Sequence, residues 1–307
     1  MRVLVTGGAG FIASHVVDAL LSAGHEVSIV DNLSTGRREN VNPSAEFYEM
    51  SINDPAFKIV LLDWRPDVIV HHAAQMDVRR STRDPIFDAE ENIIGSLRLM
   101  MAAVEAGVKK IVYASTGGAT YGDVEANPVN ESLLPNPISQ YGISKHTVEH
   151  YLFLYRRLYG LDYTILRYPN VYGPRQNPHG EAGVVAIFAQ KMLEDERCTI
   201  FGDGTKARDY VHVSDVVRAN LLALSAGGGG LFNLGTGREI SDQEVYDAVA
   251  RACGYAGEPI YGEARPGEVY RIALDASLAK RELGWTAEVG FDEGVASTVQ
   301  TMRPVNR

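Results

Sequence analysis

The sequence predicts an α/β fold with a doubly wound, parallel, Rossmann-type sheet and a smaller C-terminal domain. The first observation is the order of elements in residues 2–31, where a strand, a glycine turn, a helix and a second strand follow one another. The second is the alternation of predicted strands and helices that continues to about residue 168. The third is the loss of that alternation beyond Pro169, where we expect the change of domain.

The first turn has the residues of a dinucleotide-binding unit. The apolar strand 3–5 leads into Thr-Gly-Gly-Ala-Gly-Phe-Ile-Ala at positions 6–13. Glycines let the backbone pass close to a pyrophosphate, and the N-terminus of the following helix favours an anion. We expect the cofactor to contact Gly7, Gly10, Phe11 and Ile12.

The second strand, 27–30, ends in Asp31. A carboxylate about 20 residues past the glycine turn can accept both ribose hydroxyls of NAD, and it would repel the 2′-phosphate of NADP. A glycine trio alone often marks only a tight turn, but here the strand, the helix and the acid stand in the required places. We therefore predict NAD as the cofactor.

Composition excludes several classes of protein. The 307 residues carry a net charge of −10, which argues against a nucleic-acid surface or an anionic membrane patch. Cys198 and Cys253 stand alone, which indicates a reducing compartment without a disulfide framework or zinc ribbon. The apolar start is interrupted by glycines, His15 and Asp18, and no later run reaches transmembrane length. We expect a cytoplasmic protein.

The elements after Asp31 alternate in type. They are a strand near 46–50, a helix over 54–62, a strand over 67–71, a helix over 85–106, a strand over 110–114, a loop over 123–140, a helix from 141 or 143 to 159, and strands over 163–167 and 231–235. Such alternation implies right-handed crossovers and a parallel sheet. Sites in such sheets form beyond the carboxyl ends of the strands.

Tyr141 and Lys145 are four residues apart, so both side chains lie on one face of the predicted helix. A phenol with a pKa of about 10 is a poor base at neutral pH. A nearby ammonium and a bound cationic nicotinamide both favour the phenolate. A Tyr–Lys pair alone is often a solvated surface couple, but of the fifteen tyrosines only Tyr141 has Lys at this spacing. Its place downstream of the dinucleotide turn favours a catalytic pair.

Taken together, the glycine turn and the Tyr141–Lys145 pair resemble the extended short-chain dehydrogenase/reductase superfamily. Further stretches are similar to its nucleotide-sugar epimerases, and the likeness covers nearly the whole chain. These stretches are Leu-Arg-Tyr-Pro-Asn-Val-Tyr-Gly-Pro at 166–174, Ile-Phe-Gly-Asp-Gly at 200–204, Arg-Asp-Tyr-Val-His-Val at 208–213 and Arg-Pro-Gly-Glu at 265–268.

The resemblance implies an NAD-dependent epimerase that inverts C4 of a UDP-hexose through a 4-keto sugar. Tyr141 would take the proton of the sugar 4-OH, and Lys145 would lower the tyrosine pKa and bind the nicotinamide ribose. The other implied cofactor contacts are Asp31, Asn32, Ala73, Ala74 and Asn92. The other implied substrate contacts are Thr116, Asn170, Arg208, Arg265, Glu268 and Ile272, the last setting room beside the sugar C2 group.

The resemblance also implies the organisation of the chain. Residues 1–168 with about 210–236 would form the NAD-binding domain, and residues 169–209 with 237–307 would form the nucleotide-sugar-binding domain. Helices 85–106 and 143–159 would make the four-helix contact of a homodimer. No nucleic-acid, membrane or metal partner is implied.

One position departs from the family pattern. The family places a catalytic Ser or Thr five residues before the glycine of a Tyr-Gly pair, and that count lands on Gly117. Thr116 is the first candidate to supply the hydroxyl and Ser115 the second. The adenine-contacting Asp that often follows the third strand is also replaced, by Ser51.

Three rival functions are each disfavoured by particular residues. A nucleotide-sugar 4,6-dehydratase would carry an Asp-Glu pair after the catalytic Thr, where this chain has Gly117 and Gly118. A non-catalytic NAD sensor would have no need of the Tyr–Lys pair. His-Thr-Val-Glu-His at 146–150 matches the inverted zinc-peptidase pattern, but the helix that holds it already carries the Tyr–Lys pair, so we predict no metal.

Overall fold

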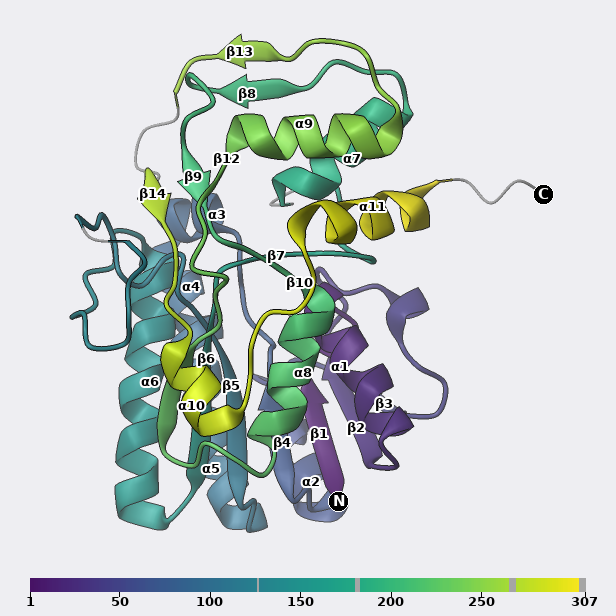
Figure 1. Cartoon of the computed structure of the whole chain (residues 1–307). Helices are drawn as coiled ribbons and strands as arrows, with labels where there is room; N and C mark the ends of the chain where they lie inside the picture. Colours follow the sequence, from purple (N-terminus) through teal and green to yellow (C-terminus); the bar gives the residue numbers. More distant parts are fainter. Residues whose placement is uncertain (126, 180–182, 265–268, 304–307) are drawn as a thin grey trace.

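The computed structural model describes residues 1–125, 127–179, 183–264 and 269–303. Within these residues a seven-stranded sheet has the order β11-β6-β5-β4-β1-β2-β3, and every neighbouring pair is parallel (Figure 1). The strands are β1 (Arg2–Thr6), β2 (Glu26–Asp31), β3 (Glu46–Glu49), β4 (Val68–His71), β5 (Lys110–Thr116), β6 (Asp162–Tyr168) and β11 (Gly230–Asn233). This order confirms the predicted doubly wound parallel sheet.

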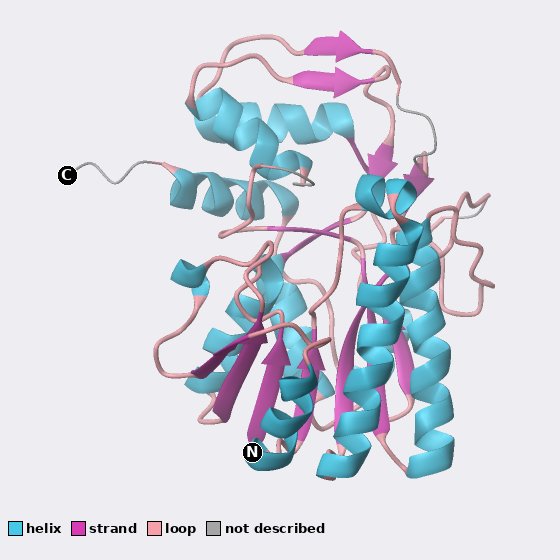
Figure 2. Ribbon diagram, turned by 180° about the vertical axis from the view of Figure 1, so that it is seen from behind, coloured by secondary structure: helices cyan, strands magenta, loops and turns pink. Residues whose placement is uncertain are grey.

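Helices cover both faces of the sheet (Figures 1 and 2). One layer contains α1 (Phe11–Ser22), α8 (Val213–Ala223) and α10 (Ser277–Leu283); the other contains α2 (Pro55–Trp64), α5 (Gly95–Ala106) and α6 (Gln140–Tyr159). Successive residues of a strand point to opposite faces. Accordingly Val3 and Val5 are buried in the cluster with α1 and α8, whereas Leu4 is buried in the cluster with α2 and α5.

The predicted helix over 85–106 is interrupted in its middle. It consists of α4 (Pro85–Ala89), a π-helical turn η2 (Glu90–Ile94) and α5, and a short helix α3 (Val78–Arg83) that the sequence did not predict precedes it. A π-helical turn inserts a residue into the helical repeat and is frequent at functional sites. Here it contains Asn92, a predicted site residue.

Beyond β6 the chain builds a second, smaller group of elements above the sheet in Figure 1. Its helices α7 (Val184–Leu193), α9 (Asp242–Cys253) and α11 (Phe291–Met302) enclose a separate hydrophobic cluster, with β8 (Thr199–Phe201) and β13 (Ile260–Gly262) beside them. The short connecting strands are β7 (Asn170–Tyr172), β9 (Ala207–Arg208), β10 (Tyr210–His212), β12 (Ile240–Ser241) and β14 (Arg271–Ile272), and η1 (Arg38–Asn40) is a 3-10 turn. This group approaches the carboxyl ends of the sheet strands, where we expect the site.

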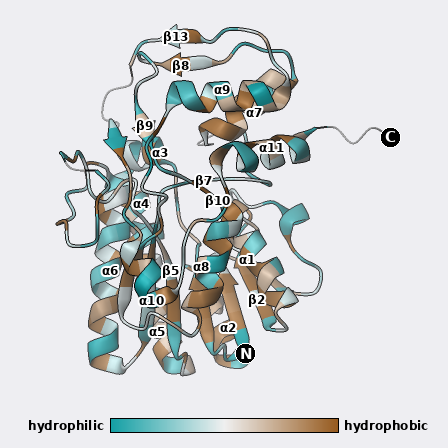
Figure 3. Ribbon diagram, viewed as in Figure 1, coloured by the Kyte–Doolittle hydropathy of each residue, from teal (hydrophilic) through white to brown (hydrophobic). Residues whose placement is uncertain are grey.

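Hydrophobic residues concentrate inside these layers. Figure 3 colours β1, β2 and α2 mainly as hydrophobic. None of the helices in the described ranges is both long enough and apolar enough to cross a membrane.

Candidate active site

The glycine turn after β1 lies against the end of β4. Gly7 has φ +71°, and a Cβ there would lie 2.7 Å from the backbone nitrogen of Ala73. Gly10 is the N-cap of α1, and no described side chain bonds to the helix start, so its first N–H groups remain available to a ligand. The turn therefore lies close to Ala73, leaves the N-terminus of α1 open and has no acidic residue in the first helical turn. These three features favour an anionic ligand.

Asp31 is fixed beside this turn. Its Oδ2 accepts a hydrogen bond from Ala9 N at 3.0 Å, and its Oδ1 accepts one from Leu33 N at 2.8 Å. Burial raises the pKa of this carboxyl, while the two backbone N–H groups lower it. The neighbouring Asn32 is exposed, and its Oδ1 accepts a hydrogen bond from Ser34 N at 3.0 Å. The carboxylate is thus oriented at the edge of the turn, as ribose binding requires.

A buried chain of hydrogen bonds ties the end of β4 to β1. Ala73 N donates to Thr6 Oγ1 at 3.2 Å, and the Thr6 hydroxyl lies 2.7 Å from Nδ1 of His71. Burial keeps the pKa of His71 well below its usual value, so the ring is neutral. We assign its proton to Nε2, which lies 3.1 Å from Ser96 Oγ, because Nδ1 then accepts from Thr6. Ala73, and with it Ala74, is thereby held beside Gly7.

Asn92 acts on the loop that follows Ala74. Its Oδ1 accepts from Gln75 N at 2.8 Å, and its Nδ2 donates to Gln75 O and to Asp88 Oδ1, both at 2.9 Å. Because these bonds use both amide hydrogens, the side chain supports the loop next to the cofactor turn. Sequence reasoning missed Asp88; its only signal was the spacing of four residues before Asn92 on a helix.

Tyr141 and Lys145 lie together at the start of α6. Ser139 caps this helix by accepting from Gly142 N at 3.2 Å. A Cβ on Gly142 would lie 2.4 Å from Ala119 O, so the glycine lets the helix start pack against the segment after β5. The Lys145 ammonium donates to Ala114 O at 3.0 Å and lies 6.0 Å from the centre of the Tyr141 ring.

Burial shifts the pKa values of Lys145 and Tyr141 in the directions that favour their uncharged forms. It lowers the pKa of Lys145 to about 8, against the raising effect of Asp88 and Glu149. It raises the pKa of Tyr141 to about 12, with a further increase from Asp88. The protein alone therefore leaves the phenol protonated at neutral pH, and additional positive charge at the site would favour the phenolate.

Thr116 and Ser115 end β5 and have different surroundings. The Ser115 hydroxyl is buried and donates to Glu149 Oε1 at 2.6 Å. Thr116 Oγ1 accepts from Ala119 N at 3.2 Å, and a Cβ on Gly118 would lie 3.9 Å from this hydroxyl and 3.6 Å from Asn170 Oδ1. The Thr116 hydroxyl thus faces the same small space as Asn170.

A side chain at Gly117 would collide with the side chain of Leu274. A Cβ at this position would lie 2.3 Å from Cδ1 of the buried Leu274. The family's hydroxyl therefore cannot stand at residue 117 without moving Leu274, and Thr116 is the nearest hydroxyl not already bonded to Glu149.

The His-Thr-Val-Glu-His pattern forms part of an ion pair. Glu149 accepts from Arg167 Nε at 2.9 Å and Nη2 at 2.5 Å, and His146 Nδ1 lies 2.8 Å from its Oε2. In the described ranges no group of three or more His, Cys, Asp and Glu side chains could hold a metal ion. Glu149 is a structural partner of Arg167.

Apart from Thr116, the predicted substrate contacts that the structure describes lie on the short strands β7, β9 and β14. Ile272 in β14 pairs with Arg208 in β9, so the strand register brings these two together. The Arg208 guanidinium donates to Tyr270 O at 3.0 Å and also to the carbonyl of Val269. The Ile272 side chain is buried in a cluster with Tyr121 and Leu274. Arg265 and Glu268 lie outside the described residues.

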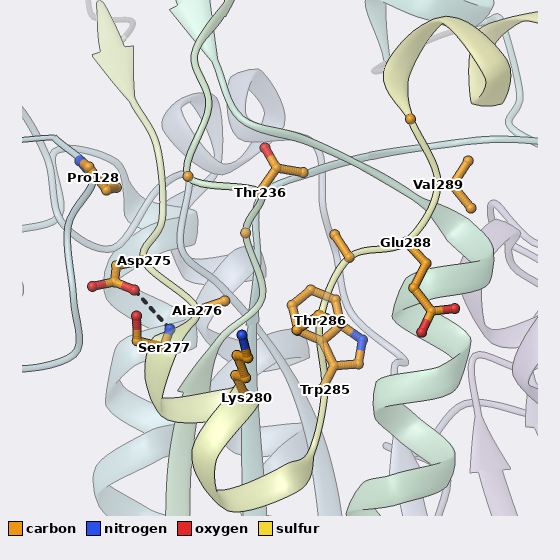
Figure 4. A pocket seen from close by; sticks show the side chains of 14 residues that line it. Pro128, Thr236, Asp275, Ala276, Ser277, Lys280, Trp285, Thr286, Glu288 and Val289 are labelled. Atoms are coloured by element: carbon orange, nitrogen blue, oxygen red, sulfur yellow. Dashed lines mark hydrogen bonds between the residues drawn. The ribbon is translucent and has the colours of Figure 1, made fainter.

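A cavity of about 420 Å³ lies apart from these residues. Figure 4 shows Lys280, Trp285 and Glu288 on its walls, with Asp275 Oδ1 accepting from Ser277 N at 2.8 Å. Of the predicted cofactor and substrate residues that the structure describes, none lines it.

Comparison with known proteins agrees with the motifs. Residues 3–235 match the NAD dependent epimerase/dehydratase family. The UDP-glucose 4-epimerase of Mycolicibacterium smegmatis is 47% identical over 309 residues, covering 99% of each chain. A crystal structure of UDP-glucose 4-epimerase from Thermotoga maritima with UDP-glucose is 50% identical with a TM-score of 0.97, covering 98% of each chain.

The NAD complex of the UDP-glucose 4-epimerase from Thermus thermophilus has 46% identity and a TM-score of 0.94, again over 98% of each chain. The similarity thus includes both the sheet and the smaller group of elements, and it extends well beyond the first two motifs. With a parallel sheet, a glycine turn followed by an acid, and a Tyr–Lys pair at the start of α6, the chain belongs to the NAD dependent epimerase/dehydratase family.

Proposed function

We propose that this protein is a UDP-glucose 4-epimerase that inverts C4 of a UDP-hexose and connects UDP-glucose with UDP-galactose. The observation that carries the proposal is the full-length similarity to epimerases of that name, with half of the residues identical in one case. The pairing of Tyr141 with the buried Lys145, whose ammonium donates to Ala114 O near the end of β5, supports it.

The residues present fit NAD. The open N-terminus of α1 and the approach of Gly7 to Ala73 suit a pyrophosphate, and the oriented Asp31 suits the adenosine ribose. Asn32, Phe11 and Ile12 would complete this part, and Ala74 would line the middle of the cofactor. When bound, NAD accepts a hydride from the sugar and returns it, and it adds positive charge near Tyr141.

Proton transfer is the task of the chain's own residues. Tyr141 Oη would take the proton of the sugar 4-OH and later return it, while Lys145 favours the phenolate and binds the nicotinamide ribose. The Thr116 hydroxyl would hold the same sugar oxygen. Asn170 and Arg208 would bind the diphosphate, since a guanidinium suits phosphate oxygens, and Arg265 and Glu268 would lie near the nucleoside.

Dehydration, the nearest rival reaction, is disfavoured by the space after Thr116. A dehydratase needs an acid and a base in the next two positions. Residues 117 and 118 are both glycine, and a Cβ at residue 117 would lie 2.3 Å from Cδ1 of Leu274. The site therefore has no proton carrier at these positions for the C5 and C6 steps.

The test is incubation of the purified protein with UDP-galactose, followed by chromatographic identification of the sugar. UDP-glucose is the expected product, a dehydrated keto sugar would indicate the rival enzyme, and unchanged UDP-galactose would favour a non-catalytic NAD-binding protein. Retention of NAD by the purified protein, measured by absorbance after denaturation, separates an inactive enzyme from one that has lost its cofactor.

We also propose that the protein forms a homodimer. Exposed apolar side chains on the α4–α5 segment and on α6 support a helix-mediated contact: Ile86, Ile94, Met101, Phe153 and Leu158. Light scattering should give twice the mass of 33.5 kDa, and Phe153→Glu should reduce it to the monomer value.

We further propose that the chain has two domains. Residues 1–168 with about 210–236 would bind NAD, and residues 169–209 with 237–307 would bind the nucleotide sugar.

A further inference from the structure

Asp88 is a buried carboxylate whose hydrogen-bond partners in the described part of the chain are all uncharged. It is 1% exposed and lies on α4. Its Oδ1 accepts from Ser81 Oγ at 2.6 Å and Asn92 Nδ2 at 2.9 Å, and its Oδ2 accepts from Ser144 Oγ at 2.5 Å. A carboxylate in such a place is costly unless another charge balances it.

Ser144, which donates to Asp88, belongs to the part of α6 that also carries Tyr141 and Lys145. Ser144 stands three residues after Tyr141 and directly before Lys145, so all three lie on adjoining parts of one helix surface. The Lys145 ammonium is buried, and its hydrogen bond goes to the carbonyl of Ala114. Asp88 therefore joins α4 to the helical turn that carries the catalytic pair.

The other carboxylate near Lys145 is already balanced. Glu149 receives two hydrogen bonds from the Arg167 guanidinium, at 2.9 and 2.5 Å. Its negative charge is thus shared with a cation that is itself buried. Asp88 has no such partner among the hydrogen-bond donors that the structure describes.

We propose that Asp88 is a positioning residue for the epimerase reaction: held by Ser144, its carboxylate supplies the negative charge that balances the Lys145 ammonium and fixes the helical turn of Tyr141. The proposal rests on the proposed function, because it assigns Asp88 a part in that same site.

The surrounding groups determine what removing this charge would do. The titratable and charged groups that act on the pair are Asp88 from α4, Glu149 from α6, Tyr113 from β5, His71 and His72 from β4, and Arg167 from β6 through Glu149. Burial holds both histidines neutral, with the pKa of His72 at about 3.

Against this background Asp88 raises the pKa of Lys145 and the pKa of Tyr141. Its neutralisation lowers both pKa values. Activity requires a deprotonated tyrosine and a protonated lysine, so the acidic and the alkaline limb of the pH profile both move to lower pH. Loss of support for the fold alone would reduce the height of the profile and leave the limbs in place.

The experiment compares Asp88→Asn with Ser81→Ala in the pH dependence of kcat/KM for UDP-galactose. The amide can still accept from Ser81 and Asn92 and can donate to Ser144, so it preserves the shape of the site. Ser81→Ala removes a donor to Asp88 and keeps the charge. We expect both limbs to shift down by about half a pH unit or more in Asp88→Asn and to stay in place in Ser81→Ala.

Unshifted limbs in Asp88→Asn, with only a lower maximum, would overturn the proposal. If Asp88→Asn does not fold, the smaller Asp88→Ser carries the same comparison. A second readout does not depend on turnover: the ¹³Cε resonance of Lys145, assigned with Lys145→Met, reports the lysine pKa in the NAD-bound protein. If the native protein fails to epimerise, the proposed function fails, and an unchanged Lys145 pKa in Asp88→Asn still decides against this role.

Discussion

Replacement of Glu149 by Gln should destabilise the fold more than any surface charge replacement. Glu149 is 5% and Arg167 2% exposed, and two hydrogen bonds of 2.9 and 2.5 Å join them. The Arg167 Nη1 also donates to Tyr121 Oη at 2.8 Å, which in turn donates to Asn233 Oδ1 at 2.9 Å. The pair thus connects α6, β6 and β11 through one buried network.

The magnitude follows from leaving Arg167 without its counter-charge. Removing one partner of a buried ion pair costs about 3–5 kcal/mol in the free energy of unfolding. The Gln oxygen can still accept one hydrogen bond, so we expect the lower end, about 3 kcal/mol. The His146 and Ser115 bonds to this carboxylate are weakened at the same time.

The effect should depend on pH. Burial raises the pKa of Glu149, but the bonds from Arg167 and His146 outweigh it, so the folded pKa is lowered below its usual value of 4.5. A lowered folded pKa contributes stability above the unfolded pKa, and that contribution is lost as pH falls through the folded pKa. The stability difference between the native protein and Glu149→Gln should therefore be full at neutral pH and shrink on acidification below about 4.5.

Urea unfolding at pH 7 and at pH 4, at fixed protein and NAD concentration, measures this difference. The matched control is Glu105→Gln, which removes an exposed ion pair with Lys58 whose side chains are 49% and 50% exposed. Such surface pairs contribute less than about 1 kcal/mol. If Glu149→Gln were no more destabilising than Glu105→Gln, the buried pair would not hold these elements together.

Four further predictions concern the site. Tyr141→Phe should lower kcat by at least about 10²-fold while NAD stays bound, since only the proton carrier is removed; turnover near the native rate would exclude Tyr141 as the base. Thr116→Val should lose far more turnover than Ser115→Ala, and the reverse order would place the hydroxyl on Ser115. Asp31→Ala should weaken NAD retention, measured by cofactor content after gel filtration, and a preference for NADP in the native protein would contradict the assignment. The native enzyme should epimerise UDP-N-acetylglucosamine as well as UDP-glucose, and Ile272→Tyr should lower kcat/KM for the acetylated sugar selectively; a native enzyme inactive on it would exclude Ile272 as the gate.

The sheet could be predicted from sequence because its signals are local. The glycine turn and Asp31 lie within about 30 residues of each other, the length of one βαβ unit. Tyr141 and Lys145 are separated by one helical turn, so their shared face follows from helix geometry alone. In the structure the glycine turn follows β1, Asp31 ends β2, and Tyr141 and Lys145 lie near the start of α6.

Features that depend on distant contacts could not be predicted in this way. The π-helical turn at Glu90–Ile94 interrupts a stretch whose residues suit a regular helix, and it brings Asn92 to the loop at Gln75. From the sequence, Asp88 would be expected on the solvent-exposed side of its helix. It is instead buried, where Ser144, 56 residues later, donates to it. Burial of a charge is decided by tertiary partners that spacing does not reveal.

The hydroxyl after β5 shows how such a contact changes the interpretation of a motif. Counting along the chain points to Gly117, but the space beside that residue is filled by Leu274, whose own position is fixed by a bond from its backbone N–H to Asp209 Oδ2 at 3.1 Å. Asp209 also accepts from Thr236 N at 3.0 Å, so it joins the segment after β11 to the segment after β14. A buried side chain more than 150 residues away therefore disfavours any side chain at residue 117, and Thr116 is the residue we propose for the hydroxyl. If Thr116 supplies the hydroxyl, as proposed, the position of this group depends on packing against Leu274, which a motif count along one strand does not reveal.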